Sequence, residues 1–206
     1  MSENERPAVE PASIDQALAP DWWETHRHKV YIALAVAILA ILAIGAFAWT
    51  QQKKRLEARN ALANATTIEE LQAVAANHEG PPAAAALILL AEDQTEAGEL
   101  DTAFATYTRF LETYPDHPLA AAAMTAQGSL QEMQGNNEEA LALYQQVTTL
   151  YPSAYVTPFA MLNQARIDRA MGRNEESQTL LQTIITQYPA SGFATEAQAM
   201  LDIQVQ

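Results

Sequence analysis

The sequence predicts an all-α protein in which a transmembrane helix is followed by an α-solenoid of about three 37-residue repeats and a C-terminal capping helix. Two observations lead to this fold class. A pattern of Gly, a small residue, an aromatic or aliphatic residue and Tyr-Pro occurs three times, each copy 37 residues after the last, and a fixed period of this length is typical of stacked helix pairs. In addition, no charged residue occurs between positions 30 and 50. We therefore divide the chain into an acidic tail (1–29), a transmembrane helix (30–50), a helical linker with N-terminal capping helices (51–81) and a repeat domain (82–206).

The tail contains six acids, three bases and several prolines, and few large aliphatic residues. A segment of this composition cannot bury enough apolar surface to offset the entropy of ordering its backbone. We therefore expect residues 1–29 to be disordered, with a brief helix at 13–19.

The apolar segment has the length of a membrane span. Its 21 residues, 30–50, would extend over roughly 30 Å as a helix, which matches the hydrocarbon core of a bilayer. Trp22, Trp23 and Tyr31 at one end and Trp49 at the other suit the two interfaces. A cleaved signal peptide would have a shorter apolar region and a small-residue cleavage site, and a buried core helix would not carry bases at both ends. We therefore predict a single-pass anchor.

The orientation of the span is left open by its flanking charges. Residues 53–59 contain four bases, whereas the opposite flank offers Arg27 and Lys29, with Arg6 farther away. The count favours a cytoplasmic C-terminal side, but the difference is small and a large following domain weakens the rule.

The linker is expected to be helical. The helix should continue from Gln51 to Ala65, and Thr67 with Glu70 has the spacing of a capping box, which predicts a second helix to about Asn77. Gly80 and the two prolines after it end this helix and begin the next one.

Each repeat is expected to form helix A, a glycine turn, helix B and a Tyr-Pro break. Gly98, Gly135 and Gly172 suit the left-handed conformation that closes a helix, and the proline after each helix B lacks the donor that continuation requires. The expected A helices are 82–97, 118–134, 155–171 and 192–204, and the expected B helices are 99–113, 136–150 and 173–187. Stacking should bury a core of Leu87, Leu90, Tyr107, Leu111, Met124, Leu130, Leu141, Tyr144, Leu162, Leu180 and Ile184.

The repeat pattern resembles the tetratricopeptide repeat. The family's small, glycine, small, aromatic, apolar and proline positions hold Ala91, Gly98, Ala103, Tyr107, Phe110 and Pro115 in the first unit; Gly128, Gly135, Ala140, Tyr144, Val147 and Pro152 in the second; and Ala165, Gly172, Ser177, Leu181, Ile184 and Pro189 in the third. The chain departs from the family in its period of 37 rather than 34, and in having Leu87, Met124 and Met161, then Gln94, Gln131 and Asp168, where Trp and Tyr are usual. We expect looser packing of the helix pairs at those positions.

The resemblance implies a right-handed solenoid whose concave surface, lined mainly by the A helices, binds other proteins. The implied groove residues are Ile88, Glu92, Thr95 and Glu96; Thr125, Ser129, Glu132 and Met133; and Phe159, Leu162, Arg166 and Arg169. The Lys/Arg/Asn clamp that holds chaperone C-termini in this family is not visible in the first two units, which argues against that mode of binding.

A span followed by such an array also resembles the single-span tetratricopeptide proteins related to the ancillary subunit of the SecYEG translocon, and periplasmic proteins with similar repeats. This resemblance implies a bacterial inner-membrane anchor with a periplasmic repeat domain that assists protein translocation or folding. The implied partners are the translocon, chaperones and client polypeptides. The alternative is a structural scaffold for an envelope complex of division or wall synthesis, and a third interpretation places the repeats in the cytoplasm.

Charge is concentrated in the repeat domain. The net charge is −14 overall, and residues 60–206 alone contain eighteen acids and four bases. This surface repels nucleic acid and would attract basic partners, or it serves only solubility. Arg166, Arg169 and Arg173 share one helix face, and they either contact an anion or a carboxylate, or pair with Glu132, Glu138 or Glu139 of the preceding unit.

The sequence favours neither an enzyme nor a metalloprotein. It contains no cysteine, no phosphate-binding loop, no nucleophile motif and no metal-ligand spacing. We expect no catalytic residue, no cofactor, no metal site, no nucleic-acid partner and no small-molecule substrate.

Overall fold

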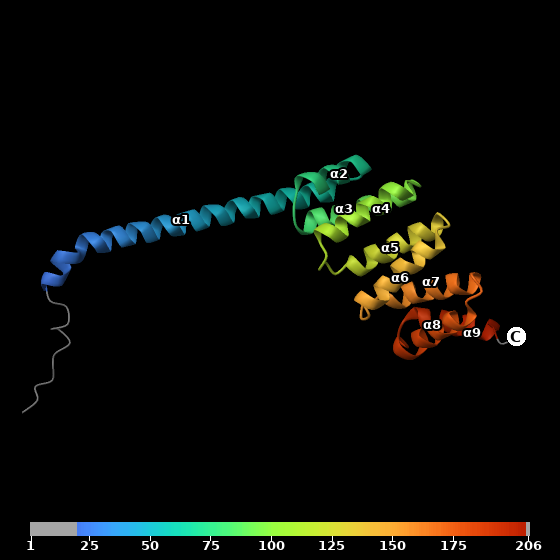
Figure 1. Ribbon diagram of the computed structural model, residues 1–206. Helices are drawn as coiled ribbons and strands as arrows, with labels where there is room; N and C mark the ends of the chain where they lie inside the picture. Colours follow the sequence, from blue (N-terminus) through green and yellow to red (C-terminus); the bar gives the residue numbers. More distant parts are fainter. Residues whose placement is uncertain (1–19, 205–206) are drawn as a thin grey trace, which may run out of the picture. The chain divides into compact units, whose positions relative to one another are not determined.

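The computed structural model describes residues 20–204, with side chains from residue 22 to residue 202. The chain divides into two compact units, the first ending at Arg55 and the second beginning at Leu56. The described regular structure is helical (Figure 1), and its elements are α1 (Pro20–Asn64), α2 (Ile68–Asn77), α3 (Pro81–Glu96), α4 (Leu100–Thr113), α5 (Ala120–Met133), α6 (Asn137–Leu150), α7 (Thr157–Ala170), α8 (Asn174–Gln187) and α9 (Gly192–Gln204).

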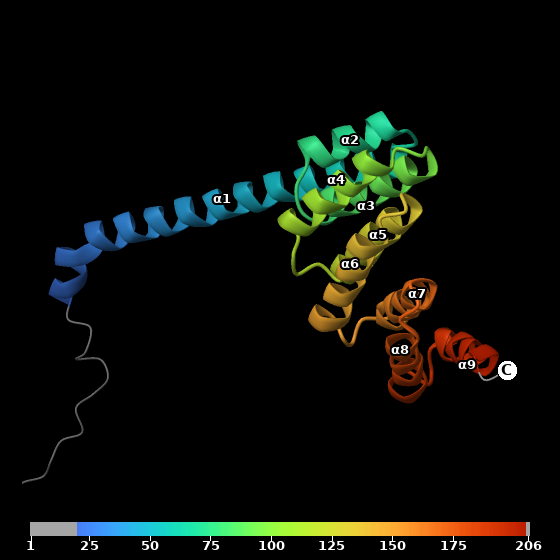
Figure 2. The same ribbon diagram turned by 45° about the vertical axis from the view of Figure 1, so that its right-hand side comes forward.

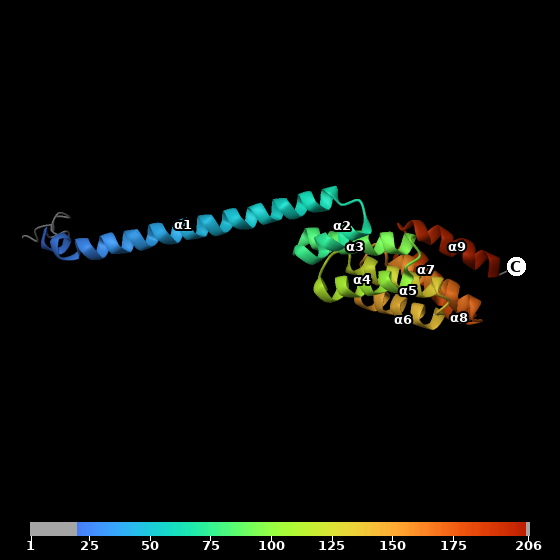
Figure 3. The ribbon, with the colours of Figure 1, turned by 90° about the horizontal axis from the view of Figure 1, so that it is seen from above.

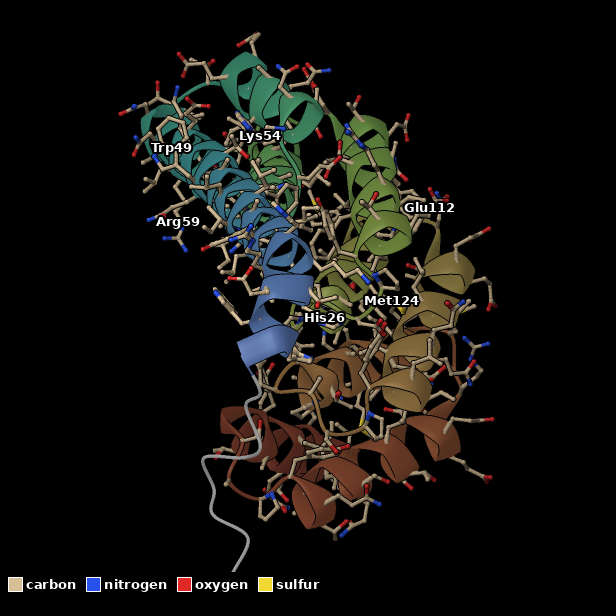
Figure 4. The ribbon with its side chains drawn as sticks, turned by 90° about the vertical axis from the view of Figure 1, so that its left-hand side faces the viewer. His26, Trp49, Lys54, Arg59, Glu112 and Met124 are labelled. Carbon is tan, nitrogen blue, oxygen red and sulfur yellow. The ribbon has the colours of Figure 1, made fainter. Side chains whose placement is uncertain are left out.

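Helix α1 contains the whole predicted span without interruption. Side chains 31–50 are all exposed, and none of the apolar window is buried against other parts of the protein. By length and composition alone, α1 can cross a membrane, a test that a signal sequence near an N-terminus also passes. Figure 4 labels His26 before the apolar segment, Trp49 near its end and Lys54 in the basic sequence that follows.

The expectation of a disordered tail to residue 29 is wrong for its last part, because residues 20–29 belong to α1. The ring of His26 stacks on that of Trp22 at a centroid distance of 4.9 Å, and His26 Nδ1 donates a hydrogen bond to the Trp22 carbonyl at 2.9 Å. This i,i+4 pair stabilises the part of α1 that precedes the apolar segment, where residues 20–29 add nearly three turns. Residues 1–19, including the helix expected at 13–19, lie outside the described part of the chain.

The second unit is built from helix hairpins. α3 pairs with α4, α5 with α6 and α7 with α8, and each hairpin packs on the next (Figures 1 and 2). α2 packs on α3, and α9 lies against α8 and α7 (Figure 3). The expected A and B helices are thus confirmed, with boundaries that differ by at most two residues. The predicted capping box at Thr67 is present with both of its hydrogen bonds.

The turn between helices A and B has the same geometry in each hairpin. Gly98, Gly135 and Gly172 have φ values of 78°, 82° and 81°, which only glycine adopts without strain. In the first turn Glu99 N donates to Gln94 O at 2.8 Å and Gly98 N donates to Thr95 O at 3.0 Å, the two bonds of a Schellman motif. Both bonds recur in the other two turns.

Three apolar clusters form the core of the second unit, one for each hairpin and its neighbours. Most of the predicted core is buried, while Leu111, Met124 (Figure 4) and Leu180 are half-buried at the edges of these clusters. Gly128 marks a close approach of the two helices in the second hairpin, since a Cβ built on it would lie 2.6 Å from Cε1 of Tyr144. The fully buried Tyr144 ring therefore occupies the space that a side chain at position 128 would need.

The three polar residues at the usual aromatic position tie helix A to helix B or to its turn. Gln94 Oε1 accepts a hydrogen bond from Thr106 at 2.7 Å, and Gln131 Oε1 accepts one from Asn136 Nδ2 at 2.8 Å. Asp168 Oδ1 lies 2.9 Å from Arg173 Nε. Polar contacts of this kind replace the packing of an aromatic ring.

Candidate functional site

A pocket with a volume of about 390 Å³ lies over the A helices of the second unit. Successive A helices supply most of its lining because each hairpin places its first helix on the same side of the stack. The lining residues belong to α3, α4, α5 and α7, apart from Val156, which caps the N-terminus of α7. They are Glu92, Thr95, Glu96, Tyr107, Ala122, Thr125, Ala126, Ser129, Leu130, Met133, Val156 and Phe159.

The floor of the pocket is largely apolar, and the hydroxyl groups of its two threonines and its serine form hydrogen bonds within the protein. Thr95 Oγ1 donates to Ala91 O and Thr125 Oγ1 donates to Ala121 O, both at 2.7 Å. Ser129 Oγ donates to Thr125 O at 3.3 Å and also contacts Tyr144 Oη at 3.1 Å. Because these groups are satisfied by their own helix or by the core, they add few free hydrogen-bonding sites to the pocket.

The rim formed by α3 is acidic. Glu92 and Glu96 are one helical turn apart, and both are exposed. Partial burial, followed by the negative charges of Asp93 and Glu96, raises the pKa of Glu92 above its ordinary value. Burial and the Glu92 carboxylate raise the pKa of Tyr107 to about 12, so Tyr107 is a neutral phenol at physiological pH.

Phe159 and Met133 form the opposite side of the pocket. The half-buried Phe159 ring packs on Phe193 of α9 at a centroid distance of 5.2 Å, which restricts its orientation. Met133 is 61 % exposed at the end of α5, and its flexible thioether can adapt to different occupants. Phe159 and Met133 together form the apolar wall of the pocket, in which the aromatic ring is fixed and the methionine is adaptable.

Beyond this wall, Arg166 and Glu132 form an ion pair within the protein. Arg166 Nη2 donates to Glu132 Oε1 at 3.1 Å, and Arg166 Nη1 donates to Asn163 Oδ1 at 2.8 Å. Tyr144 Oη donates to the other oxygen of Glu132 at 3.2 Å, and burial is the largest cause that raises the pKa of Tyr144 to about 12. Arg166 is therefore bound within the protein.

Arg173 is also paired. Two of the three arginines in this cluster, Arg166 and Arg173, therefore form ion pairs with the preceding unit, as one of the two interpretations expected. Its guanidinium contacts Asp168 at 2.9 Å and Glu138 at 3.5 Å. Burial raises the pKa of Asp168 although the Arg173 charge opposes this shift. Among the described residues, Arg169 is half-exposed without an ion pair.

The structure brings together only part of the groove implied by the sequence. Glu92, Thr95, Glu96, Thr125, Ser129, Met133 and Phe159 line the pocket, with Glu132 and Arg166 paired nearby. Leu162 does not belong to an accessible groove, because it is 2 % exposed and packs in the third core cluster. Ile88 is half-buried against the first cluster.

Sequence reasoning missed five lining residues. Ala122 and Ala126 precede Ser129 and Met133 at helical spacing, so extension of that face toward the start of α5 would have found them. Leu130 and Tyr107 had been placed in the core, and Val156 was not considered. Tyr107 comes from a B helix, which a groove drawn from A helices alone omits.

Comparison with known families agrees with this geometry. A tetratricopeptide repeat model matches residues 82–153, and a second tetratricopeptide repeat model matches residues 159–191. The chain is a tetratricopeptide-repeat protein. The two matches cover about half of this tetratricopeptide-repeat chain, and they include nearly all of α3, the whole of α4 to α6, most of α7 and the whole of α8. A search of curated proteins finds no match.

Tetratricopeptide repeats bind other proteins, so this protein carries a protein–protein interaction module. Its surface can supply apolar contact and negative charge. Within residues 20–204 no group of three or more His, Asp or Glu side chains is placed to hold a metal ion.

Proposed function

We propose that this tetratricopeptide-repeat protein is a membrane-anchored interaction module that assists protein translocation or folding at the bacterial inner membrane, with its repeats in the periplasm. The pocket over the A helices is the observation that carries the proposal. It places an apolar floor, an acidic rim and an exposed methionine where the side chains of a bound polypeptide can enter. Binding of this kind requires no catalytic residue and no cofactor, and we propose that the protein is not an enzyme.

The anchor in this proposal is α1. Its apolar segment is exposed from residue 31 to residue 50, and leaving so large an apolar surface in water is unfavourable by roughly 25 cal/mol for each Å². A bilayer would cover it, with the Trp residues at the interfaces and the bases at 53–59 among the lipid head groups. Membrane attachment would keep the repeats close to proteins that cross or leave that membrane.

Photo-crosslinking in living cells tests the interaction. A photoreactive amino acid at Met133 stands at the edge of the pocket, and the same amino acid at Glu112 provides a control, because Glu112 is exposed on α4 outside the pocket (Figure 4). We expect many exported polypeptides, or subunits of the export machinery, to be captured from position 133 only. A single stoichiometric envelope protein would favour the scaffold alternative. Equal capture from both positions would contradict binding at the pocket.

A labelling experiment tests the orientation. The chain has no cysteine, so a Glu112→Cys variant carries one thiol in the repeats and a Ser2→Cys variant carries one in the tail. A membrane-impermeant maleimide should label position 112 in spheroplasts, and it should label position 2 only after lysis. The reverse pattern would place the repeats in the cytoplasm and would overturn the periplasmic part of the proposal.

A further inference from the structure

We infer that the pocket between α3, α5 and α7 binds a polypeptide segment in which an aliphatic or aromatic side chain lies next to a lysine or arginine. This inference rests on the proposed interaction function and specifies the chemistry of the partner. It follows from the shape of the pocket, from the charges at its rim, and from the way the nearby arginines are already engaged.

The floor of the pocket selects an apolar side chain. Ala122, Ala126 and Leu130 of α5 offer only carbon atoms, and the hydroxyl of Thr125 is bonded to its own helix. A polar side chain placed here would lose its water without gaining partners, which is unfavourable. An aliphatic or aromatic side chain would instead gain the free energy of removing its own surface and that of Phe159 from water.

The α3 rim selects a positive charge. Glu92 and Glu96 both line the pocket, and among the described residues neither forms an ion pair. Partial burial and then the neighbouring carboxylates of Asp93 and Glu96 raise the pKa of Glu92, so the rim is a site where negative charge is crowded. A lysine or arginine of the partner would supply the missing charge, whereas an acidic segment would be repelled.

The bases of this domain do not neutralise the rim from within. Residues 60–206 contain four bases, and three of them have other partners. Arg109 Nη2 donates to Ala75 O at 3.0 Å, Arg166 is bound to Glu132, and Arg173 is bound to Asp168. The fourth, Arg169, is not among the residues that line the pocket.

These positions also give the occupant a direction. The acidic rim belongs to α3, while the apolar wall formed by Met133 and Phe159 belongs to α5 and α7. The basic residue of the partner should therefore lie at the first repeat and its apolar residue at the second and third. Beyond the wall, Arg166 and Glu132 offset each other's charge in a partly exposed ion pair.

Fluorescence anisotropy with defined peptides tests the inference on the full-length protein in a nonionic detergent. The probe is a fluorescein-labelled dodecapeptide that contains Lys-Leu-Leu-Lys between Gly-Ser flanks. Two matched peptides replace both lysines with glutamate or both leucines with serine. We expect each replacement to weaken binding roughly tenfold or more, since each removes about 1.4 kcal/mol or more of favourable interaction. Binding of the lysine peptide should also weaken with added salt.

Variants of the protein locate the binding. Glu92→Gln combined with Glu96→Gln should weaken the lysine peptide roughly tenfold, and Met133→Ser should weaken it several-fold through lost apolar contact. A matched control replaces two exposed carboxylates outside the pocket, Glu112→Gln and Glu175→Gln, and should leave binding unchanged. Far-UV circular dichroism checks that each variant is folded.

Two outcomes would overturn the inference. One is equal binding of the lysine and glutamate peptides, and the other is an equal loss in the pocket and control variants. If either occurs while position 133 still captures proteins in cells, the chemistry assigned to the partner is wrong and the proposed function stands. If position 133 captures nothing and no peptide binds, both fail together.

Discussion

Replacement of Gly128 by Ala tests whether the second hairpin is as closely packed as the structure indicates. The new Cβ would meet three atoms of the Tyr144 ring at 2.6, 2.9 and 3.0 Å. The ring would have to retreat by about 0.8 Å, which is the difference between 2.6 Å and the 3.4 Å at which ordinary contact begins. Tyr144 is fully buried, and its hydroxyl is held by Ser129 and Glu132. The retreat therefore strains the core and stretches both hydrogen bonds.

The expected magnitude follows from three effects. Overpacking of a core costs about 1–3 kcal/mol, and two weakened hydrogen bonds cost up to about 1 kcal/mol each. Alanine in place of glycine inside a helix returns about 1 kcal/mol. We expect a net loss of about 2 kcal/mol from the free energy of unfolding of the second unit. The first hairpin accommodates Ala91 opposite its own tyrosine, but Tyr107 is less deeply buried than Tyr144.

Urea unfolding followed by circular dichroism at 222 nm measures this loss. Tryptophan fluorescence is unsuitable because all three tryptophans lie at positions 22, 23 and 49 of α1. Gly192→Ala is the matched control, since a Cβ at position 192 meets no atom within 4 Å. The double variant Gly128→Ala/Tyr144→Leu copies Ala165 and Leu181 of the third hairpin and should recover part of the loss. Unchanged stability of Gly128→Ala would refute the close contact and with it the packing argument.

Three further predictions concern single residues. Thr67→Ala removes the capping box with Glu70 and should lower the free energy of unfolding by about 1 kcal/mol, measured by urea unfolding, whereas Thr67→Ser should keep most of it. Thr106→Val leaves the buried Gln94 Oε1 without its donor and should cost about 1–3 kcal/mol in the same assay; a neutral result would show that water replaces the hydroxyl. Binding of the lysine peptide should fall as the pH is lowered through the pKa of Glu92, because protonation removes the charge that attracts lysine. Since burial and then the neighbouring carboxylates raise that pKa, the fall should begin at a higher pH than for an ordinary glutamate, and Glu92→Gln should flatten it; an unaltered pH profile in that variant would assign the effect elsewhere.

The features that the sequence predicts well are those with local causes. Gly98 and its two counterparts need a positive φ, and each Tyr-Pro removes a donor, so helix ends could be read within two residues. Ion pairs from Arg166 to Glu132 and from Arg173 to Glu138 were one of the two alternatives left open for this cluster, and these partners lie 34 and 35 residues earlier, close to one repeat. Stacking brings such positions together.

The pocket was less predictable because it depends on how successive hairpins are rotated against each other. That rotation turns Leu162 into the third core cluster and brings Tyr107 from a B helix to the pocket. Neither outcome follows from the 37-residue period, because the period identifies which positions pack but does not fix the angle between successive hairpins. The helical start of α1 was missed for a different reason, since the prolines and acids of residues 1–29 taken together outweighed the stacking of Trp22 on His26.

The identical turns have a consequence for how such a protein can change in length. The amides of Glu99, Asn136 and Arg173 all bond to the carbonyl five residues earlier. The backbone therefore has the same local geometry at each of these turns, so one turn can replace another. If a gene lost or duplicated one 37-residue segment from turn to turn, the new junction would therefore have the same turn as before and would need no new kind of loop. Recombination could lengthen or shorten the binding surface one hairpin at a time, while the polar side chains that vary between hairpins change which partner it fits.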